Sequence, residues 1–465
     1  MTFSYIIHIG ILSGALLIGA LLRSKVKFIQ HFLIPSSIIG GFFLLVTYNF
    51  ITPHFGLSSD FLGELVFHLL NISFIAMMLR HPEKKEKSRA VSDNIIAILL
   101  QYGFQVAFGL ILTLVLIYTV YPDLFPAFGL ALPLGFELGP GQAYSISLPW
   151  ESMGFEGATS VGLALAAIGF LVGSIGGVIL INIGVAHGWV DAETAAKLRS
   201  RGVRTGFLSK DEMRESSKFT TDSESIDSFT YHIALVMVTY ILSSLVLLIV
   251  EKLLSFIGPL GVELANSLWG VNFIFSTFVA AGVRQLMIAL HIHHTVDDGT
   301  LNRINGLSVD LTVAASLGSI SLVAIASYTV PIILLTLVGI IITCVILPFY
   351  ASRLYDDHKF YRMLLLFGTA TGTLPTGLSL LRVVDPDFKT PVAQDYVYAA
   401  GPVFFLVLPI IVCANLPAYS YVQNNPLLFY ALLGLSLLYT FVCIVLYIIR
   451  GKEKAFGKMR HLFYR

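Results

Sequence analysis

The chain has 465 residues, of which 56% are hydrophobic and only 12% are charged, and its formal net charge is +1. Soluble domains carry about 25% charged residues, so this chain has too little polar surface to stay dissolved as a globule. Its near-zero charge also excludes the strong overall field that recruits nucleic acid or acidic partners. The composition therefore predicts an integral membrane protein.

Apolar runs near the 20 or so residues that a helix needs to cross a bilayer occur on both sides of a polar linker. The first run lacks the basic start and small-residue cleavage site of a signal peptide, so we expect it to be retained. The expected spans are 4–22, 32–53, 61–79, 94–121, 157–183, 230–256, 267–289, 306–327, 330–352, 396–416 and 426–449. Two further apolar segments, 126–148 and 363–381, are interrupted by Gly, Pro, Ser and Thr and are short for a regular crossing.

The positions of Lys and Arg predict which side of the membrane each loop between the spans lies on. If the N-terminus is outside and the two interrupted segments do not cross, 25 of the 29 basic residues fall in predicted cytoplasmic stretches. These stretches are 23–27, 80–89, 187–229, 290–304, 353–362 and 450–465. Cytoplasmic loops are enriched in Lys and Arg, so the pattern predicts an N-terminus outside and a C-terminus in the cytoplasm. If only one interrupted segment crossed, the asymmetry would be lost.

The linker at 187–229 divides the chain into two units of the same order: four spans, an interrupted segment and a fifth span. Because five is odd, the second unit starts on the opposite side of the membrane, which predicts two inverted-topology repeats. We expect a first repeat at 1–186, a second at 230–417, and an additional C-terminal helix with a basic tail at 418–465. The predicted fold class is an all-α polytopic membrane protein. It has two inverted five-helix repeats, each with a re-entrant hairpin, and about 11 spans.

The interrupted segments carry the strongest functional signal. The first contains GFELGPGQAYSIS at 135–147, and the second contains GTATGTLPTGLS at 368–379. Backbone that is not helical cannot face lipid, because each unpaired polar group costs several kcal/mol. Two Gly- and Pro-interrupted segments at corresponding places in two halves point to the binding site of a transporter. Their carbonyl and hydroxyl oxygens suit Na⁺, and helix N-termini at their tips suit an anion.

Glu137 is the single acid in the first segment. An acid at membrane depth is by default a functional hypothesis, and the alternative is a structural residue that caps or hydrogen-bonds the hairpin backbone. The other residues that we expect to line the site are Gly139, Gly141, Gln142, Ser145, Gly372, Thr373, Pro375 and Thr376.

Further polar residues at depth have two interpretations each. Asn71 and Asp310 lie in the third spans of the two units and are candidates for the site, although an N-cap is the favoured role for Asp310. Arg382, which follows the second segment, is either a bidentate clamp for a substrate carboxylate or an ion-pair partner in a loop. Gln101 and Gln105 face one way at i, i+4, and a helix–helix hydrogen bond is their favoured role.

Several motifs together resemble the bacterial sodium/glutamate symporter family over about residues 1–417. They are a Gly-rich motif at 154–162 that runs into a Gly- and Ala-rich span at 166–177, the second broken segment at 368–378, the Asn415-Leu-Pro417 end of the following span, and Ile34-Pro35 with Gly40-Gly41. The family motif has paired glycines and a histidine where this chain has Phe136, Glu137 and Leu138.

The resemblance implies Na⁺ as the coupling ion, a homodimer with a scaffold part and a moving transport part, and Asn415 as a site residue. With the span map, it predicts a symporter in the plasma (inner) membrane. This symporter imports glutamate or a related anionic carboxylate by alternating access, with the lipid bilayer and a small anion as partners. A non-glutamate substrate, a substrate sensor and an anion channel with the broken segments as its filter remain alternatives. The sequence has no GxxxxGK[ST], GxSxG or HExxH motif, so nothing predicts an enzyme or an ATP-driven pump.

Overall fold

The computed structural model of the protein describes residues 4–32, 34–81, 89–190, 205–207, 218–222, 224–256, 265, 268–269, 271–385 and 390–457. Most of the predicted linker at 187–229 and the last basic residues of the tail lie outside these ranges. Within them every regular element is a helix, which confirms the predicted all-α class.

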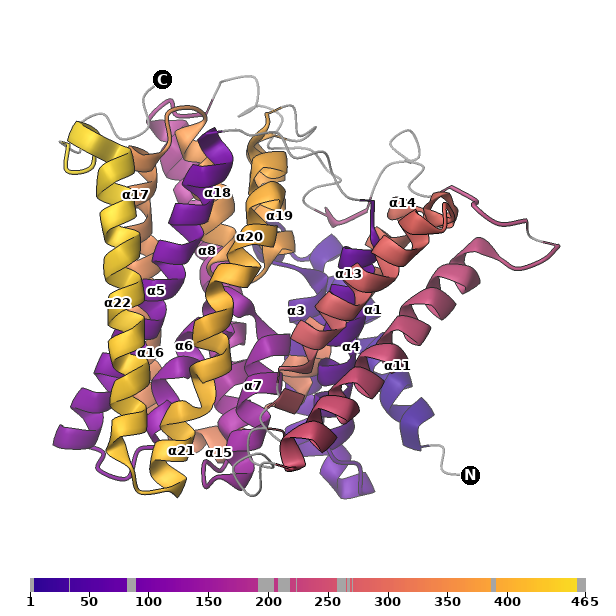
Figure 1. The fold of residues 1–465 in the computed structure, drawn as a ribbon, viewed down its shortest axis with the longest axis horizontal. Helices are drawn as coiled ribbons and strands as arrows, with labels where there is room; N and C mark the ends of the chain where they lie inside the picture. Colours follow the sequence, from indigo (N-terminus) through magenta and orange to yellow (C-terminus); the bar gives the residue numbers. More distant parts are fainter. Residues whose placement is uncertain are drawn as a thin grey trace.

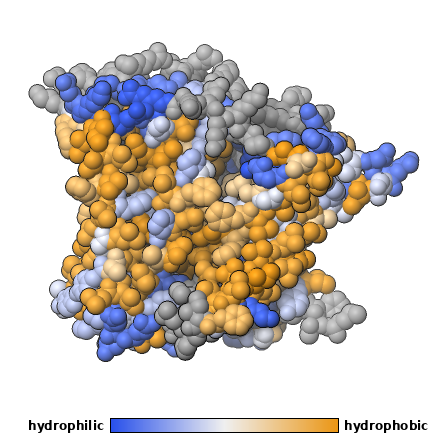
Figure 2. Space-filling model, in the orientation of Figure 1, coloured by the Kyte–Doolittle hydropathy of each residue, from blue (hydrophilic) through white to orange (hydrophobic). Residues whose placement is uncertain are grey.

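Ten helical stretches are long and apolar enough to cross a membrane, in the part of the chain that the structure describes. They are formed by α1 (Ser4–Lys25), α3 (Ser36–Val46) with its continuation to Phe55, α4 (Asp60–Leu79), α5 (Arg89–Thr119), α8 (Ala158–Ala186), α11 (Ser228–Ser255), α13 (Asn272–Ala289), α16 (Thr329–Ile341) with α17 (Leu347–Leu354), α20 (Val392–Val412) with α21 (Leu416–Val422), and α22 (Pro426–Gly451). Figure 2 shows a broad apolar belt between two hydrophilic bands. The predicted polytopic membrane protein is confirmed.

One predicted span differs from its helix. The range 306–327 corresponds to α14 (Asp298–Gly318), a short break, and α15 (Leu322–Ala326). The helix starts early because the Asp297 side chain caps it, accepting a hydrogen bond from the Thr300 backbone N–H at 2.7 Å. The first half of α14 is too polar for this helix to be one of the ten long apolar stretches. Asp310 lies inside this helix, so the expected N-cap role for Asp310 is wrong.

The helices form two groups (Figure 1). The inclined group on the right contains α1, α3, α4, α11, α13 and α14, and it has its own small buried apolar clusters. Within it α1 packs on α3, and in the same way α11 packs on α13. Helix α3 also packs on α14, and correspondingly α13 packs on α4. This reciprocal packing is what two related units would produce, and the inverted repeat itself stays a prediction.

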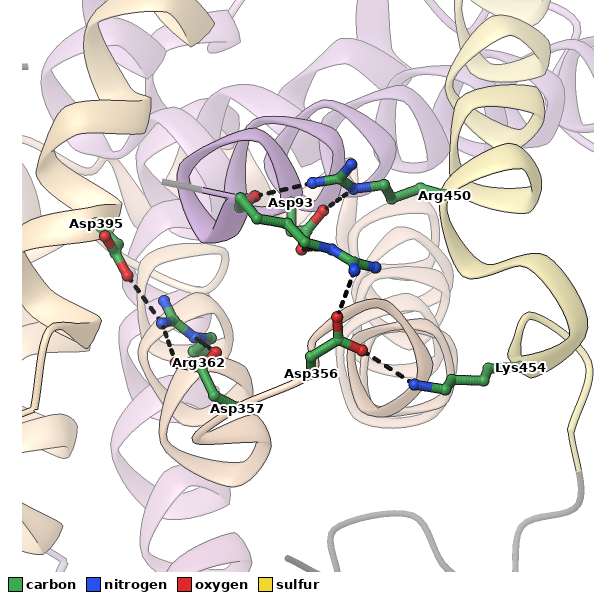
Figure 3. Close-up of polar contacts among 8 residues, drawn as sticks. Asp93, Asp356, Asp357, Arg362, Asp395, Arg450 and Lys454 are labelled. Atoms are coloured by element: carbon green, nitrogen blue, oxygen red, sulfur yellow. Dashed lines mark hydrogen bonds and ion pairs between the residues drawn. The ribbon is translucent and has the colours of Figure 1, made fainter. Parts of the chain in front are cut away.

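The second group contains α5, α8, α16, α17, α20 and α22 around the largest buried apolar cluster. The additional helix α22 is an integral part of it, because α22 packs along α5. At the contact, a Cβ on Gly103 would lie 2.8 Å from Thr440 Oγ1, so only glycine allows this approach. Arg450 at the end of α22 pairs with buried Asp93 of α5 (Figure 3).

Candidate functional site

The first interrupted segment is a helical hairpin with a break of one residue. The chain enters through the short turns η3 (Pro126–Leu130), α6 (Ala131–Pro133) and η4 (Leu134–Leu138), and returns as α7 (Pro140–Ser152). Gly139 joins the two arms at φ 86° and ψ 178°, a conformation essentially restricted to glycine. Pro140 is tolerated directly after it, because the first helical residue needs no backbone N–H. The hairpin ends at Ser152, four residues beyond the predicted 126–148.

The second interrupted segment is also a hairpin, of α18 (Lys359–Thr369) and α19 (Leu374–Val384). Its arms approach closely, since a Cβ on Gly368 would lie 2.6 Å from the Gly377 Cα. Between them the chain turns and then extends at Thr373, with φ −147° and ψ 168°. Pro375 falls in the first turn of α19. The hairpin extends the predicted 363–381 by a few residues at each end.

The tips of the two hairpins meet. A Cβ on Gly139 would lie 3.0 Å from Thr373 Cγ2 and 3.3 Å from the Gly372 carbonyl oxygen. Segments separated by more than 230 positions in the chain are thus in direct contact at their helix breaks.

The two hairpins reach this contact from opposite ends of the α20–α21 helix. At the base of the first, the Phe125 ring lies 5.2 Å from that of Tyr421 in α21. At the base of the second, Arg362 of α18 pairs with Asp395 at the start of α20, with an Nη2–Oδ2 distance of 2.8 Å (Figure 3). The arrangement is the one expected of hairpins that enter from opposite membrane faces, and their re-entrant character stays a prediction.

Helix α8 packs against both hairpins through its glycines. A Cβ on Gly169 would lie 2.7 Å from the Thr371 carbonyl oxygen and 3.3 Å from Phe136 Cδ2. One turn later, a Cβ on Gly173 would lie 2.6 Å from Thr371 Oγ1. The Gly- and Ala-rich span that the sequence singled out therefore works as a close-packing surface for both tips.

Gln105 of α5 connects the two hairpins at their tips. Its Nε2 lies 3.3 Å from the Ala370 carbonyl oxygen in the second hairpin and 3.5 Å from Glu137 Oε2 in the first. The predicted helix–helix role holds for Gln101, whose Oε1 lies 3.3 Å from the Tyr350 hydroxyl of α17. It also holds for Gln105, whose hydrogen bond to the Ala370 carbonyl joins α5 to the second hairpin.

Glu137 is half-buried, and four tyrosines from four different helices lie close enough to interact electrostatically with its carboxyl group. They are Tyr102 of α5, Tyr350 of α17, Tyr396 of α20 and Tyr439 of α22. The Tyr396 hydroxyl also bonds Thr369 Oγ1 at 2.8 Å, at the end of α18. These residues are scattered over more than 330 positions, so no spacing in the sequence could have identified them.

The other predicted tip residues lie along the first turns of the returning helices. A Cβ on Gly141 would lie 2.5 Å from Leu70 Cδ1, which places the first hairpin against α4 of the inclined group. Gln142 is half-buried, and buried Ser145 has no hydrogen-bond partner for its Oγ. In the second hairpin the Thr373 and Thr376 hydroxyls lie 3.5 Å apart.

Asn71 and Asp310 occupy matching places away from the tips. Asn71 of α4 accepts a hydrogen bond from Ser276 of α13 at 2.8 Å, and Asp310 of α14 has a polar interaction with Ser37 of α3. Both therefore join a third span to a second span inside the inclined group. Helix α4 touches the first hairpin through Leu70 and Gly63, and a role for Asn71 in binding stays a prediction.

Asn415 and Arg382 also lie away from the tips. Asn415 accepts a hydrogen bond from Trp150 Nε1 at 2.7 Å, which fastens the far end of α7 to the α20–α21 junction. Arg382 is exposed in the last turn of α19, about 14 Å along the helix from Thr373. The structure gives Asn415 a bracing contact and leaves the substrate role of Arg382 a prediction.

Comparison with known proteins gives one match. The family model described as sodium/glutamate symporter matches residues 1–359, more than three quarters of the chain. The match includes the first hairpin and ends where α18 begins, before the second hairpin and α22. No curated protein and no solved structure matched the chain. The chain belongs to the sodium/glutamate symporter family.

Proposed function

We propose that this protein is a sodium-coupled secondary transporter that imports glutamate or a related anionic carboxylate by alternating access. Family membership supports sodium/glutamate symport in general. The observation that carries the proposal for this chain is the contact between two broken helices, at Gly139 and Thr373, inside an apolar bundle.

The chemistry of the tips suits an anion together with a hard cation. Helices α7 and α19 both begin at the contact, so the partial positive charges of both N-termini are directed there. Oxygen atoms that could hold Na⁺ surround the same place: the Ala370 and Gly372 carbonyls, the Thr373 and Thr376 hydroxyls, and the Glu137 carboxylate. The anion would bind at the N-termini, near Gln142 and Ser145.

The two groups of helices supply the parts that alternating access requires. The hairpin group surrounds the largest apolar core, and it meets the inclined group at close contacts such as Gly141 against Leu70 and through a smaller apolar cluster that joins α8 to α3 and α14. We assign the inclined group to a scaffold that forms a homodimer and the hairpin group to the moving part. The protein would lie in the inner membrane with its N-terminus outside.

Uptake into liposomes tests this function. Purified protein is reconstituted, and radiolabelled L-glutamate uptake is measured with an inward Na⁺ gradient, with equal Na⁺ on both sides, and with choline replacing Na⁺. A symporter accumulates substrate above the external concentration only under the gradient. Unlabelled aspartate, glutamine and C4 dicarboxylates as competitors then define the substrate.

Two results would contradict the proposal. Equilibration without accumulation would identify a channel, in which the broken segments act as a filter. Uptake that is the same in Na⁺ and choline would exclude sodium coupling. Empty liposomes and the Gly139→Ala variant provide the controls for leak.

A further inference from the structure

Glu137 is a carboxylate without a counterion. Among the described residues no Lys, Arg or His forms an ion pair with it, and its hydrogen-bond partner is the neutral amide of Gln105. Among the described residues, the titratable groups that interact electrostatically with Glu137 are the four tyrosines of α5, α17, α20 and α22. An ionised acid at this depth is costly unless a cation or a proton neutralises it.

Helices α5 and α22 carry unpartnered polar atoms. Gln101 Nε2, Gln105 Oε1 and the Tyr439 hydroxyl are buried and have no hydrogen-bond partner. For Gln105 the two neighbouring acceptors, Glu137 and the Ala370 carbonyl, assign the NH₂ group to the side that faces them. Its oxygen must therefore be the atom left over. Buried polar groups are normally satisfied, so a free oxygen beside an uncompensated carboxylate points to a bound cation.

The charge of Glu137 also bears on the transported anion. Glu137 precedes the tip residue Gly139 by two positions, and the proposed anion would bind at the same tips. In a site of low dielectric, an ionised Glu137 would repel this anion strongly. A cation bound at Glu137 removes the repulsion, and by reciprocity a bound anion strengthens cation binding.

We infer that Glu137, Gln105 and Tyr439 form the binding site for one monovalent cation, Na⁺ or H⁺, whose occupancy permits the anion to bind at the hairpin tips. This inference depends on the proposed function only for the identity of the anion. It gives α22, which lies beyond the family match, a direct part in coupling through the Tyr439 hydroxyl.

Thermal unfolding of the purified protein in detergent tests the site without any transport assay. The wild type and Glu137→Gln are melted with NaCl increasing against choline chloride at constant ionic strength, pH 8, and then from pH 5 to 9 in choline chloride. Glu156→Gln, an exposed loop acid, is the matched control. A ligand of the folded state raises stability in proportion to RT ln(1 + [L]/Kd), so a bound cation raises the melting temperature by a few degrees.

The NaCl series and the pH series distinguish Na⁺ from a proton as the bound cation. If Na⁺ binds, NaCl stabilises the wild type and Glu156→Gln, and Glu137→Gln loses this response. If a proton binds, the folded state holds the proton that the unfolded state releases, so wild-type stability falls as pH rises, and Glu137→Gln flattens that slope. A Glu137→Gln protein with wild-type responses to both Na⁺ and pH overturns the inference, and so does a wild type that responds to neither.

Tyr439→Phe keeps the test decisive if Glu137→Gln does not fold. It removes only a buried hydroxyl without a partner, so basal stability should be unchanged or higher. The apparent cation affinity should weaken by about 3- to 10-fold, the value of one hydrogen bond. An unchanged affinity excludes Tyr439 from the site. Failure of glutamate uptake with an intact cation response would reject the proposed substrate and leave the cation site standing.

Discussion

The two hairpins meet at their tips but differ in the charged side chains that they carry. The first has an acid, Glu137, two residues before its tip, and its base is fastened by a neutral Trp150–Asn415 hydrogen bond. The second has only glycines, hydroxyls and apolar residues at its tip, and its base holds the buried Arg362–Asp395 ion pair.

The difference separates two uses of charge in an apolar environment. A buried charge with a complementary partner fixes one element to another, as Arg362 fixes α18 to α20. A charge without a protein partner is costly to stability and is retained where a ligand supplies the partner. The ion pair of Arg362 anchors the base of the second hairpin, and the unpaired acid at the tip of the first is the residue to which we attribute ligand binding.

Breaking the anchor should have the largest effect on stability. Arg362→Leu leaves the Asp395 carboxylate buried and uncompensated, which should cost about 3–5 kcal/mol of unfolding free energy. Asp357→Asn, which weakens the half-exposed second partner of Arg362, should cost at most about 1 kcal/mol. Denaturant unfolding in detergent measures both. Equal losses in the two variants would show that the buried pair is not the anchor.

Substitution at the tip contact should impair transport more than stability. Gly139→Ala adds a methyl group at 3.0 Å from Thr373 and strains a glycine-only conformation, which costs about 1–3 kcal/mol. We expect uptake to fall at least about 10-fold, because a shift of 1 Å in a site can cost more than that.

Gly56→Ala is the control for this change. Gly56 also has a positive φ, 69°, but an added Cβ there meets nothing within 4 Å. It should therefore lose some stability and keep its uptake. If both variants transport equally well, the contact between the tips has no functional importance.

Weakening the base of the first hairpin should have a smaller effect. Trp150→Phe keeps most of the ring packing but leaves Asn415 Oδ1 without its donor, at a cost of about 1–2 kcal/mol. Thermal unfolding with and without substrate measures the change. A loss as large as that of Arg362→Leu would mean that the two bases are anchored equally strongly.

The smallest effect concerns the exposed charges beside the second hairpin (Figure 3). A hydrogen bond from Lys454, with the nearby charges of Lys454 and Arg89, lowers the pKa of Asp356, which follows α17. Its contribution to stability is present above the usual aspartate pKa near 4 and disappears as pH falls through the lower folded value.

Asp356→Asn should remove this acid-side slope from the unfolding temperature. Because the pair is exposed, the change at pH 7 should be below about 1 kcal/mol. A steeper loss of stability on acidification in the variant than in the wild type would contradict the assignment.

Individual helices and residues show which features of the structure could be predicted from the sequence. Hydropathy predicted the long apolar helices, because lipid imposes length and polarity on each helix independently, and the orientation drawn from Lys and Arg stays a prediction. The predicted span at 306–327 was wrong in its limits. Helix α14 starts at a polar cap, and it is packed against α3 and α4 although its first half is not apolar. Of the predicted site residues, those from 137 to 145 and from 372 to 376 lie at or next to the tips, while Asn71, Asp310, Asn415 and Arg382 lie elsewhere.

The sequence by itself determined that this is a helical membrane protein with two broken segments, because glycine, proline and an isolated acid in an apolar run are local signals. Only the tertiary structure decided that Gly139 meets Thr373, that Gln105 joins both hairpins and that Tyr439 of the last helix lies within electrostatic range of Glu137. These contacts join residues 32 to more than 300 positions apart. They depend on how whole helices pack, which no local pattern encodes.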